Sequence, residues 1–144
     1  MEKRTRRFLL AIDGSKNAER ALLEARSLAA HTGAELTILT TVKPLFLPYY
    51  GNAALLKKDN EQLEKSKKGL LENALEFFED FPIKVETKLR KGDPAEEILD
   101  EAEEFDYDLI VMGSKGLGMF SRALLGSVSS KVLNHTDTNV LIIK

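Results

Sequence analysis

Three glycines near the end of the chain have a spacing that suits phosphate binding. Gly113 closes an apolar run that begins at Asp108, Gly116 follows it, and Gly126-Ser127 opens a helix-like segment. Glycines let the main chain approach an anion, amide hydrogens then point toward it, and a helix N-terminus adds positive potential. The spacing therefore predicts a phosphate-binding turn.

Two widespread phosphate motifs are absent from this segment. No Gly-x4-Gly-Lys-Ser/Thr pattern occurs, and Gly116-x-Gly118 is followed by Ser121 where a dinucleotide fingerprint has glycine. A single glycine such as Gly113 can also simply form a turn. The prediction therefore depends on the spacing of the whole set.

Asp13 is the candidate acidic group. It follows the apolar run 8–12, and its carboxylate only accepts hydrogen bonds, which suits a sugar hydroxyl or Mg²⁺. Capping the next helix is an alternative role, and the two roles are compatible. Lys115 either supplies a cation to phosphates or is solvated, and Ser127 and Ser129 either bind phosphate or cap the last helix.

The sequence does not contain a recognisable catalytic set. There are no cysteines, and we interpret the two histidines, His31 and His135, as helix-end residues. The glutamate pairs at 96–97 and 103–104 are typical of solvated helix faces. We therefore expect a binding protein rather than an enzyme.

Apolar patterns alternate between strand-like and helix-like along the chain. Strands are expected at 8–12, 36–42, 83–89, 109–112 and 139–143, and helices at 17–31, 53–81, from 94 onward and 128–135. This order predicts an α/β fold with a parallel sheet and helices on both faces. Ligands of such sheets bind at the carboxyl ends of strands, where the strand order reverses.

Local signals refine these elements. Ser15 and Gly33 are expected to cap the first helix, and Asp93 with Pro94 starts the third. The alternation over 83–89 predicts a strand at or near a sheet edge. An apolar stripe is expected on the second helix, made by Leu63, Leu70, Leu71, Ala74, Leu75 and Phe78.

Composition indicates one globular domain over residues 1–144. The chain is 43% hydrophobic and 31% charged, and its net charge of -2 argues against nucleic acid as the main partner. The basic group Lys3, Arg4, Arg6 and Arg7 is interpreted as a solvated flank of the first strand, with an anion-binding arm as the alternative. No run reaches the roughly 18 apolar residues that cross a bilayer, so we expect a cytoplasmic protein with no membrane contact.

The spaced glycines and Ser127 closely resemble the ATP-binding signature of the universal stress protein family. Matching segments cover nearly the whole chain, at 11–15, 33–36, 92–94, 108–113 and 139–143. The resemblance implies a Rossmann-like, three-layer sandwich with a five-stranded parallel sheet of order 3-2-1-4-5. In that order the first and fourth strands are neighbours, and Asp13 and Gly113 face one crevice.

The resemblance also implies a nucleotide site. Asp13 would lie near the ribose or a phosphate-bound Mg²⁺ or Mn²⁺ ion. Adenine and ribose would lie beside Ala11, Val42, Met112 and Gly113, and the phosphates beside Ser114, Lys115, Gly116, Gly126, Ser127, Val128 and Ser129. Because all three spaced glycines are present, we expect the ATP-binding branch, a regulatory stress-response protein with at most slow hydrolysis.

Two other functions are considered. One is a dimeric interaction module that binds no nucleotide and uses its glycines only for turns. The other is a phosphoacceptor receiver domain, which needs an aspartate after its central third strand, where this chain has Arg90-Lys91-Gly92.

The last strand, Asn139–Ile143, is apolar and expected at the sheet edge, which favours pairing with a second copy. The corresponding strand forms the dimer interface in the family, so we expect a homodimer. The aromatic loop between Phe46 and Tyr50 either covers the crevice or adds to a partner surface.

Overall fold

The structure is a computed structural model that describes residues 4–46, 51–116 and 125–144. Strands and helices alternate along the chain, as the apolar pattern predicts. The elements are β1 (Arg7–Ala11), α1 (Lys16–Thr32), β2 (Glu35–Val42), α2 (Ala53–Glu76), β3 (Val85–Lys91), α3 (Pro94–Glu104), β4 (Leu109–Gly113), α4 (Ser127–His135) and β5 (Asn139–Ile143).

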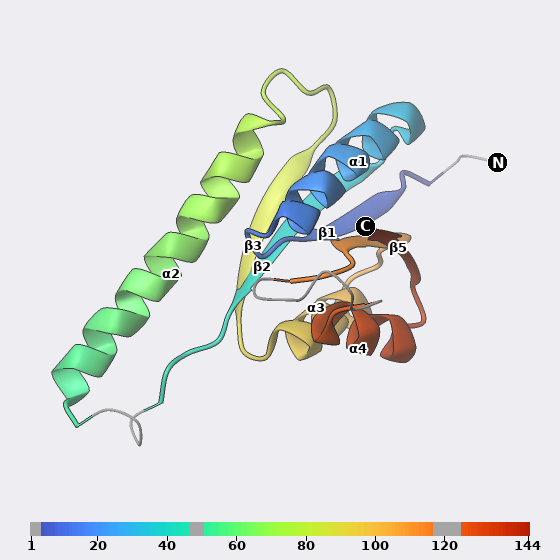
Figure 1. Ribbon diagram of the computed structural model, residues 1–144. Coiled ribbons are helices and arrows are strands. Elements are labelled where there is room, and N and C mark those ends of the chain that lie inside the picture. Colours follow the sequence, from blue (N-terminus) through green and yellow to red (C-terminus); the bar gives the residue numbers. More distant parts are fainter. Residues whose placement is uncertain (1–3, 47–50, 117–124) are drawn as a thin grey trace.

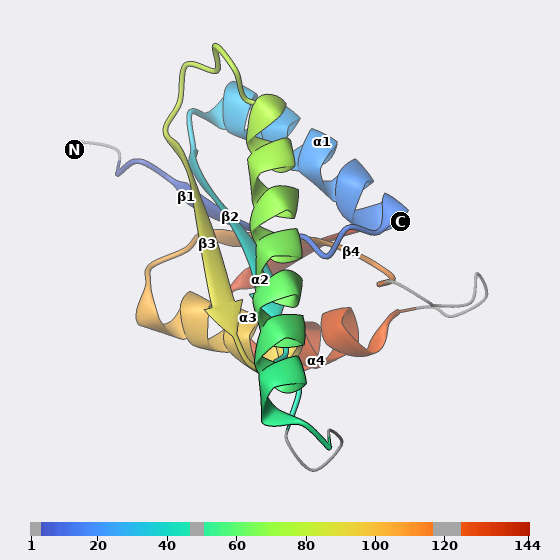
Figure 2. The same ribbon diagram turned by 90° about the vertical axis from the view of Figure 1, so that its left-hand side faces the viewer.

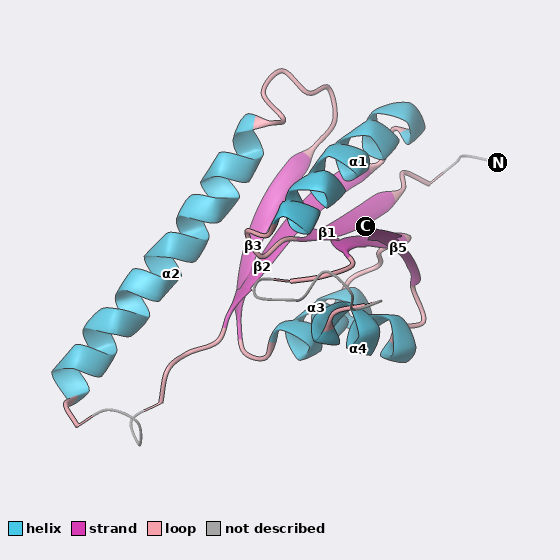
Figure 3. Cartoon of the chain, viewed as in Figure 1, coloured by secondary structure: helices cyan, strands magenta, loops and turns pink. Residues whose placement is uncertain are grey.

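The strands form one parallel sheet of five, in the order β3-β2-β1-β4-β5, which confirms the predicted order. Figure 3 shows the strands in magenta, with β3, β2 and β1 side by side. β1 lies between β2 and β4, and Ala11 at its end pairs with Leu39 on one side and Met112 on the other. β3 is an edge strand, as its alternating pattern predicts. This position excludes the receiver domain, whose third strand is central.

The helices cover both faces of the sheet, so the fold has three layers (Figure 1). α1 and α2 pack on one face, and α3 and α4 pack on the other (Figure 2). Each interface has its own apolar core, because the strand residues alternate between the two faces. Leu10 and Ile38 are buried under α1 and α2, whereas Leu9 and Ile110 are buried toward α3 and α4.

The predicted helix caps are confirmed. Ser15 Oγ accepts a hydrogen bond from the N–H of Ala18, and Asp93 accepts one from the N–H of Glu96. Gly33 ends α1 with a φ of 72°, a left-handed conformation that a residue with a Cβ adopts only with strain.

The second helix differs from its prediction. It ends at Glu76 rather than at residue 81, because the N–H of Phe78 donates to the C=O of Leu75 in a tighter turn, and Pro82 follows. Only Leu71 and Ala74 of the expected stripe are buried within the helix. Among the described helices, none is both long and apolar enough to cross a membrane.

The basic group at the N-terminus lies at the amino ends of β1 and β4. Arg4 forms an ion pair with Asp108, and the guanidinium of Arg7 lies 4.9 Å from the ring centre of Tyr107. Burial alone would raise the pKa of Asp108, but hydrogen bonds from the main chain of Arg7 and from Arg4 lower it overall. Two arginines of this group therefore hold β1 beside β4, and Lys3 lies outside the described residues.

Candidate functional site

A cavity of about 400 Å³ opens at the carboxyl ends of β1, β2 and β4. After β1 the chain continues to β2 on one side, and β4 lies on the other side, so the cavity is at the switch point of the sheet. Its volume is within the range of small-molecule sites. We call it the switch-point pocket.

Eleven of the twelve predicted site residues line the switch-point pocket, and Ser114 does not. Strand ends contribute Ala11, Val42 and Met112, and the turns after β1 and β4 contribute Asp13 and Lys115. The remaining predicted residues that line it are Gly113, Gly116, Gly126, Ser127, Val128 and Ser129. Gly118 and residues 47–50 lie outside the described residues.

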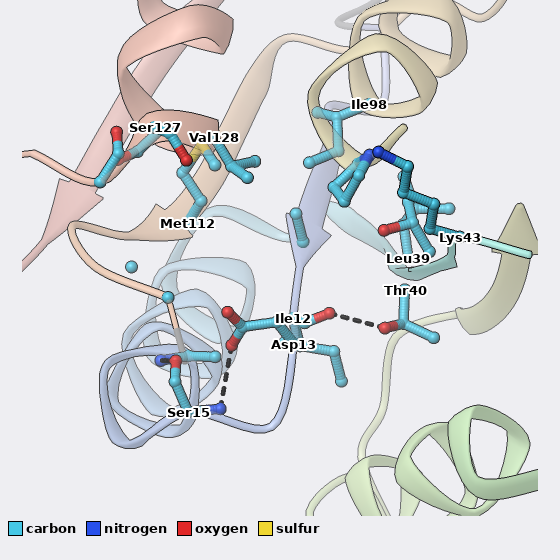
Figure 4. A pocket seen from close by; sticks show the side chains of 18 of the residues that line it. Ile12, Asp13, Ser15, Leu39, Thr40, Lys43, Ile98, Met112, Ser127 and Val128 are labelled. Carbon is cyan, nitrogen blue, oxygen red and sulfur yellow. Dashed lines mark hydrogen bonds between the residues drawn. The ribbon is translucent and has the colours of Figure 1, made fainter. Parts of the chain in front are cut away.

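Asp13 points into the pocket beside Ser15 (Figure 4). Its Oδ1 accepts a hydrogen bond of 2.9 Å from the N–H of Ser15, while Ser15 itself is the N-cap of α1. Asp13 therefore supports the turn before the helix without capping the helix. Its other oxygen, Oδ2, lies 2.9 Å from the point that a Cβ atom at Gly116 would occupy.

The other two spaced glycines allow main chains to pack closely. A Cβ at Gly113 would lie 2.8 Å from Cβ of Asn17, so glycine lets β4 end against the first turn of α1. A Cβ at Gly126 would lie 3.3 Å from the C=O of Ser114, to which the N–H of Gly126 donates a hydrogen bond of 2.6 Å. Gly113 and Gly126 therefore allow the close packing of the two turns that line the pocket.

Ser114 holds these turns together from within the core. Its Oγ accepts a hydrogen bond from Asn17 Nδ2, and its N–H donates to the C=O of Ile143. Its C=O also accepts a hydrogen bond of 3.0 Å from Ser129 Oγ. Ser114 is 2% exposed and therefore supports the wall of the pocket from behind.

The N-terminus of α4 lies at the wall of the pocket. Gly126 is its N-cap and supplies no side-chain hydrogen bond, so the amides of the first turn lack the partner that a capping side chain gives. Ser127 is exposed at this end and lines the pocket. The main-chain amides and the dipole at such a helix end attract an anion.

Several residues that the sequence analysis missed complete the pocket. Lys43 follows β2, Lys67 and Leu63 come from α2, and Pro94 and Ile98 come from α3. With Lys115, the described lining carries three lysines against one aspartate, in a protein whose net charge is -2. Lys43 could have been predicted as a pocket residue, because it directly follows β2. Lys67 and Leu63 could not, because nothing in the sequence indicates how α2 is rotated on the sheet.

The histidines lie at helix ends, as we interpreted them. Nδ1 of His31 is 2.7 Å from the C=O of Ser27 in the last turn of α1, and Nδ1 of His135 is 2.8 Å from the C=O of Lys131 in α4. Neither lines the switch-point pocket. Over the parts of the chain that the structure describes, no three His, Cys, Asp or Glu side chains gather into a metal site.

The sheet order and the pocket define the chain as a doubly wound α/β protein with a cavity at its switch point whose volume suits a small molecule. The model of the universal stress protein family matches residues 4–144, and the chain belongs to this family.

Individual relatives agree with this assignment. The chain is 35% identical to universal stress protein YxiE of Bacillus subtilis, covering 96% of this chain and 98% of the relative. The solved structure of UspA from Lactobacillus plantarum has a TM-score of 0.86 at 27% identity, covering 99% of this chain and 100% of that one. A universal stress protein solved in complex with cAMP has a TM-score of 0.73 at 28% identity, covering 96% of this chain and 97% of that one.

Proposed function

We propose that this protein is a regulatory nucleotide-binding protein that takes ATP, with Mg²⁺ or Mn²⁺, in the switch-point pocket. One observation carries the proposal: an uncapped helix N-terminus and a glycine turn that includes Lys115 face a cavity with an apolar wall. This combination suits a ligand with a flat apolar ring and a polyphosphate. A structural neighbour in complex with cAMP supports the choice of an adenine nucleotide.

The phosphates bind at the turns after β4 in this proposal. The amides at Gly116 and at the first turn of α4 donate to phosphate oxygens, and Lys115 and Ser127 add a cation and a hydroxyl. A Cβ at Gly116 would crowd the Asp13 carboxylate and one at Gly126 would crowd the main chain of residues 114–116, which fits a pair of turns that need glycine at both positions. Asp13 contributes one oxygen to the ribose or to the metal ion, which takes its other ligands from phosphates and water.

The nucleotide acts as a ligand rather than a substrate. Fast phosphoryl transfer needs a base or water-positioning group beside the phosphates. The titratable side chains of the described lining are Asp13, Lys43, Lys67 and Lys115, and both histidines lie elsewhere. We expect bound ATP to shift a conformational or partner-binding equilibrium, with at most slow hydrolysis.

The proposed assembly is a two-fold dimer through β5. This strand forms the second edge of the sheet, and its residues Val140, Leu141, Ile142 and Ile143 are apolar and only partly buried. Pairing with a second copy would cover this edge. Light scattering at micromolar concentration tests the assembly, and a monomeric mass would contradict it.

Calorimetric titration with ATP, with and without Mg²⁺, tests nucleotide binding. The wild-type protein should bind, and Gly116→Val and Gly126→Val should each weaken binding by about tenfold or more, since a branched side chain fills the cradle. Gly69→Val is the matched control, because a Cβ at Gly69 meets nothing within 4 Å. Circular dichroism establishes that each variant is folded.

The result that overturns the proposal is a flat trace for folded wild-type protein at millimolar nucleotide. That outcome favours the dimeric interaction module. Unchanged ATP affinity in both glycine variants would also contradict the assignment of the phosphates to these turns.

A further inference from the structure

Two lysines in the switch-point pocket have no partner in the described structure. Lys43 and Lys67 both line the pocket, and neither forms a hydrogen bond or ion pair with another described residue. Two other lysines do have a partner, because Lys68 and Lys91 both form ion pairs with Glu64. These contacts lower the pKa of Glu64. Lys43 and Lys67 are therefore available to a ligand.

The two lysines lie far from the proposed phosphate turns. Lys43 follows β2, and Lys67 is on α2, which packs against β2 and β3. The glycine turns follow β4, and β1 separates β2 from β4. Two strand spacings amount to about 10 Å. Figure 4 shows Lys43 and Ser127 on opposite sides of the pocket.

An apolar stretch joins these two ends of the pocket. It consists of side chains from both the sheet and the covering helices: Ala11, Leu39, Ile98, Met112 and Val128. A ligand whose only anionic group lies at the α4 end would leave the opposite lysines unmatched. The lining suits a molecule with an apolar centre and an anionic group at each end.

We propose that the switch-point pocket also accepts a second anionic group on the nucleoside part of a bound nucleotide, and that Lys43 and Lys67 bind this group. This inference rests on the proposed function, because the glycine turns hold the first phosphate group. The second group is either a phosphate on the ribose or a carboxylate on the base. Both groups are anions with several acceptor oxygens, and two ammonium groups can bind either of them.

Calorimetric titrations with matched ligands test this inference. AMP is compared with adenosine 2′,5′-bisphosphate, adenosine 3′,5′-bisphosphate and N6-(1,2-dicarboxyethyl)-AMP, which add a phosphate to the ribose or a pair of carboxylates to the base. At least one of these three ligands should bind wild-type protein at least about fivefold tighter than AMP does. Two partly exposed ion pairs can supply a gain of this size. The ligand that gains identifies the source, and the gain should shrink as salt is raised from about 0.05 M to about 0.5 M.

The double variant Lys43→Gln/Lys67→Gln should bring the affinity ratio between that ligand and AMP close to one. Lys57→Gln/Lys58→Gln is the control, because it removes the same charge from exposed positions of α2 that do not line the pocket. The control should keep the wild-type ratio.

Two outcomes overturn the inference while leaving nucleotide binding intact. In one, AMP binds and none of the three doubly anionic ligands binds more than twofold tighter. In the other, the gain persists in the Lys43→Gln/Lys67→Gln variant. Failure of both AMP and ATP to bind counts instead against the proposed function, and the inference falls with it.

Discussion

Asp13 Oδ2 lies 2.9 Å from the point that a Cβ atom at Gly116 would occupy. The carboxylate after β1 therefore lies close beside the glycine turn after β4, with no room for a side chain between them. Ser15 reinforces this junction, because its N–H donates to Asp13 Oδ1 and its hydroxyl lies 3.4 Å from the C=O of Lys115. The conformation of the turn after β1 therefore depends on that of the turn after β4.

The proximity of Asp13 to Gly116 predicts that the two positions are coupled. Gly116→Ala should displace the Asp13 carboxylate and weaken nucleotide binding by about tenfold, while the free energy of unfolding changes by less than about 1 kcal/mol because the carboxylate can rotate. In the Asp13→Ala background, the same change should weaken binding less than twofold. Calorimetry on the four proteins measures the coupling. An equal loss in both backgrounds would show that Gly116 acts independently of Asp13.

A second prediction compares two helix N-cap residues, Ser15 and Asn52, of which only Ser15 also lines the pocket. Ser15→Ala removes the N-cap of α1 and the contact with the turn after β4, and should cost about 1 kcal/mol of unfolding free energy. Asn52→Ala removes the N-cap of α2, whose Oδ1 accepts from the N–H groups of Ala54 and Leu55, at a similar cost. Urea denaturation measures both.

The two cap variants should differ in nucleotide affinity. Ser15 lines the switch-point pocket and Asn52 does not, so only Ser15→Ala should weaken binding measurably. Equal affinities in the two variants would mean that the link between the β1 and β4 turns is dispensable.

The third prediction concerns Ser129, a buried residue whose hydroxyl donates to the C=O of Ser114 at 3.0 Å. Ser129→Ala should lower the free energy of unfolding by about 1 kcal/mol, the usual value of a lost hydrogen bond. Ser130→Ala is the control, since Ser130 lies on the same helix and does not line the pocket. Equal stabilities of the two variants in urea would contradict a bracing role for the Ser129 hydroxyl.

Much of the fold was predictable because local signals and the global pattern agree. The caps at Ser15, Gly33 and Asp93 mark helix ends that the apolar periodicity also marks. The strand order came from the family resemblance, since alternation alone gives a parallel sheet without its order. The end of α2 was missed because Leu75 and Phe78 continue a helical spacing that the tighter turn after Glu76 interrupts.

Pocket residues that directly follow the ends of strands could be predicted from the sequence. Pocket residues in other places were harder to predict. The family resemblance placed Ser114 beside the phosphates. Its side chain points inward to Asn17, because the direction of a side chain after a strand depends on the turn. Lys67 and Ile98 reach the pocket from helices. Their positions depend on how α2 and α3 rotate on the sheet, which tertiary packing sets.

The fourth prediction follows from a buried carboxylate on α3. Glu101 is 1% exposed and accepts hydrogen bonds from Lys88 at 2.8 Å, Arg90 at 3.0 Å and Tyr107 at 2.7 Å. Burial alone would raise the pKa of Glu101, but these hydrogen bonds outweigh it and hold the pKa below its ordinary value of 4.5. Burial and the neighbouring carboxylate also raise the pKa of the Tyr107 hydroxyl. The network ties edge strand β3 to α3.

A carboxyl whose pKa is lower in the folded state than in the unfolded chain stabilises the fold when it is ionised. The stabilisation from Glu101 should therefore be complete above its unfolded pKa, near 4.5, and be lost as the pH falls through its lower folded value. Glu101→Gln removes the charge between Lys88 and Arg90 and should cost about 2 to 3 kcal/mol at neutral pH. The cost should shrink as the solution is acidified below about pH 4.5.

Urea denaturation from pH 3 to pH 8 checks this dependence on Glu101. Glu103→Gln is the control, because Glu103 is exposed on the same helix, and it should change stability by less than about 0.5 kcal/mol at every pH. Other carboxylates, Asp108 among them, also have lowered pKa values, so only the difference between wild type and Glu101→Gln isolates this group. A difference that stays constant down to pH 3 would show that Glu101 stabilises the β3–α3 contact by packing and hydrogen bonding, without its charge.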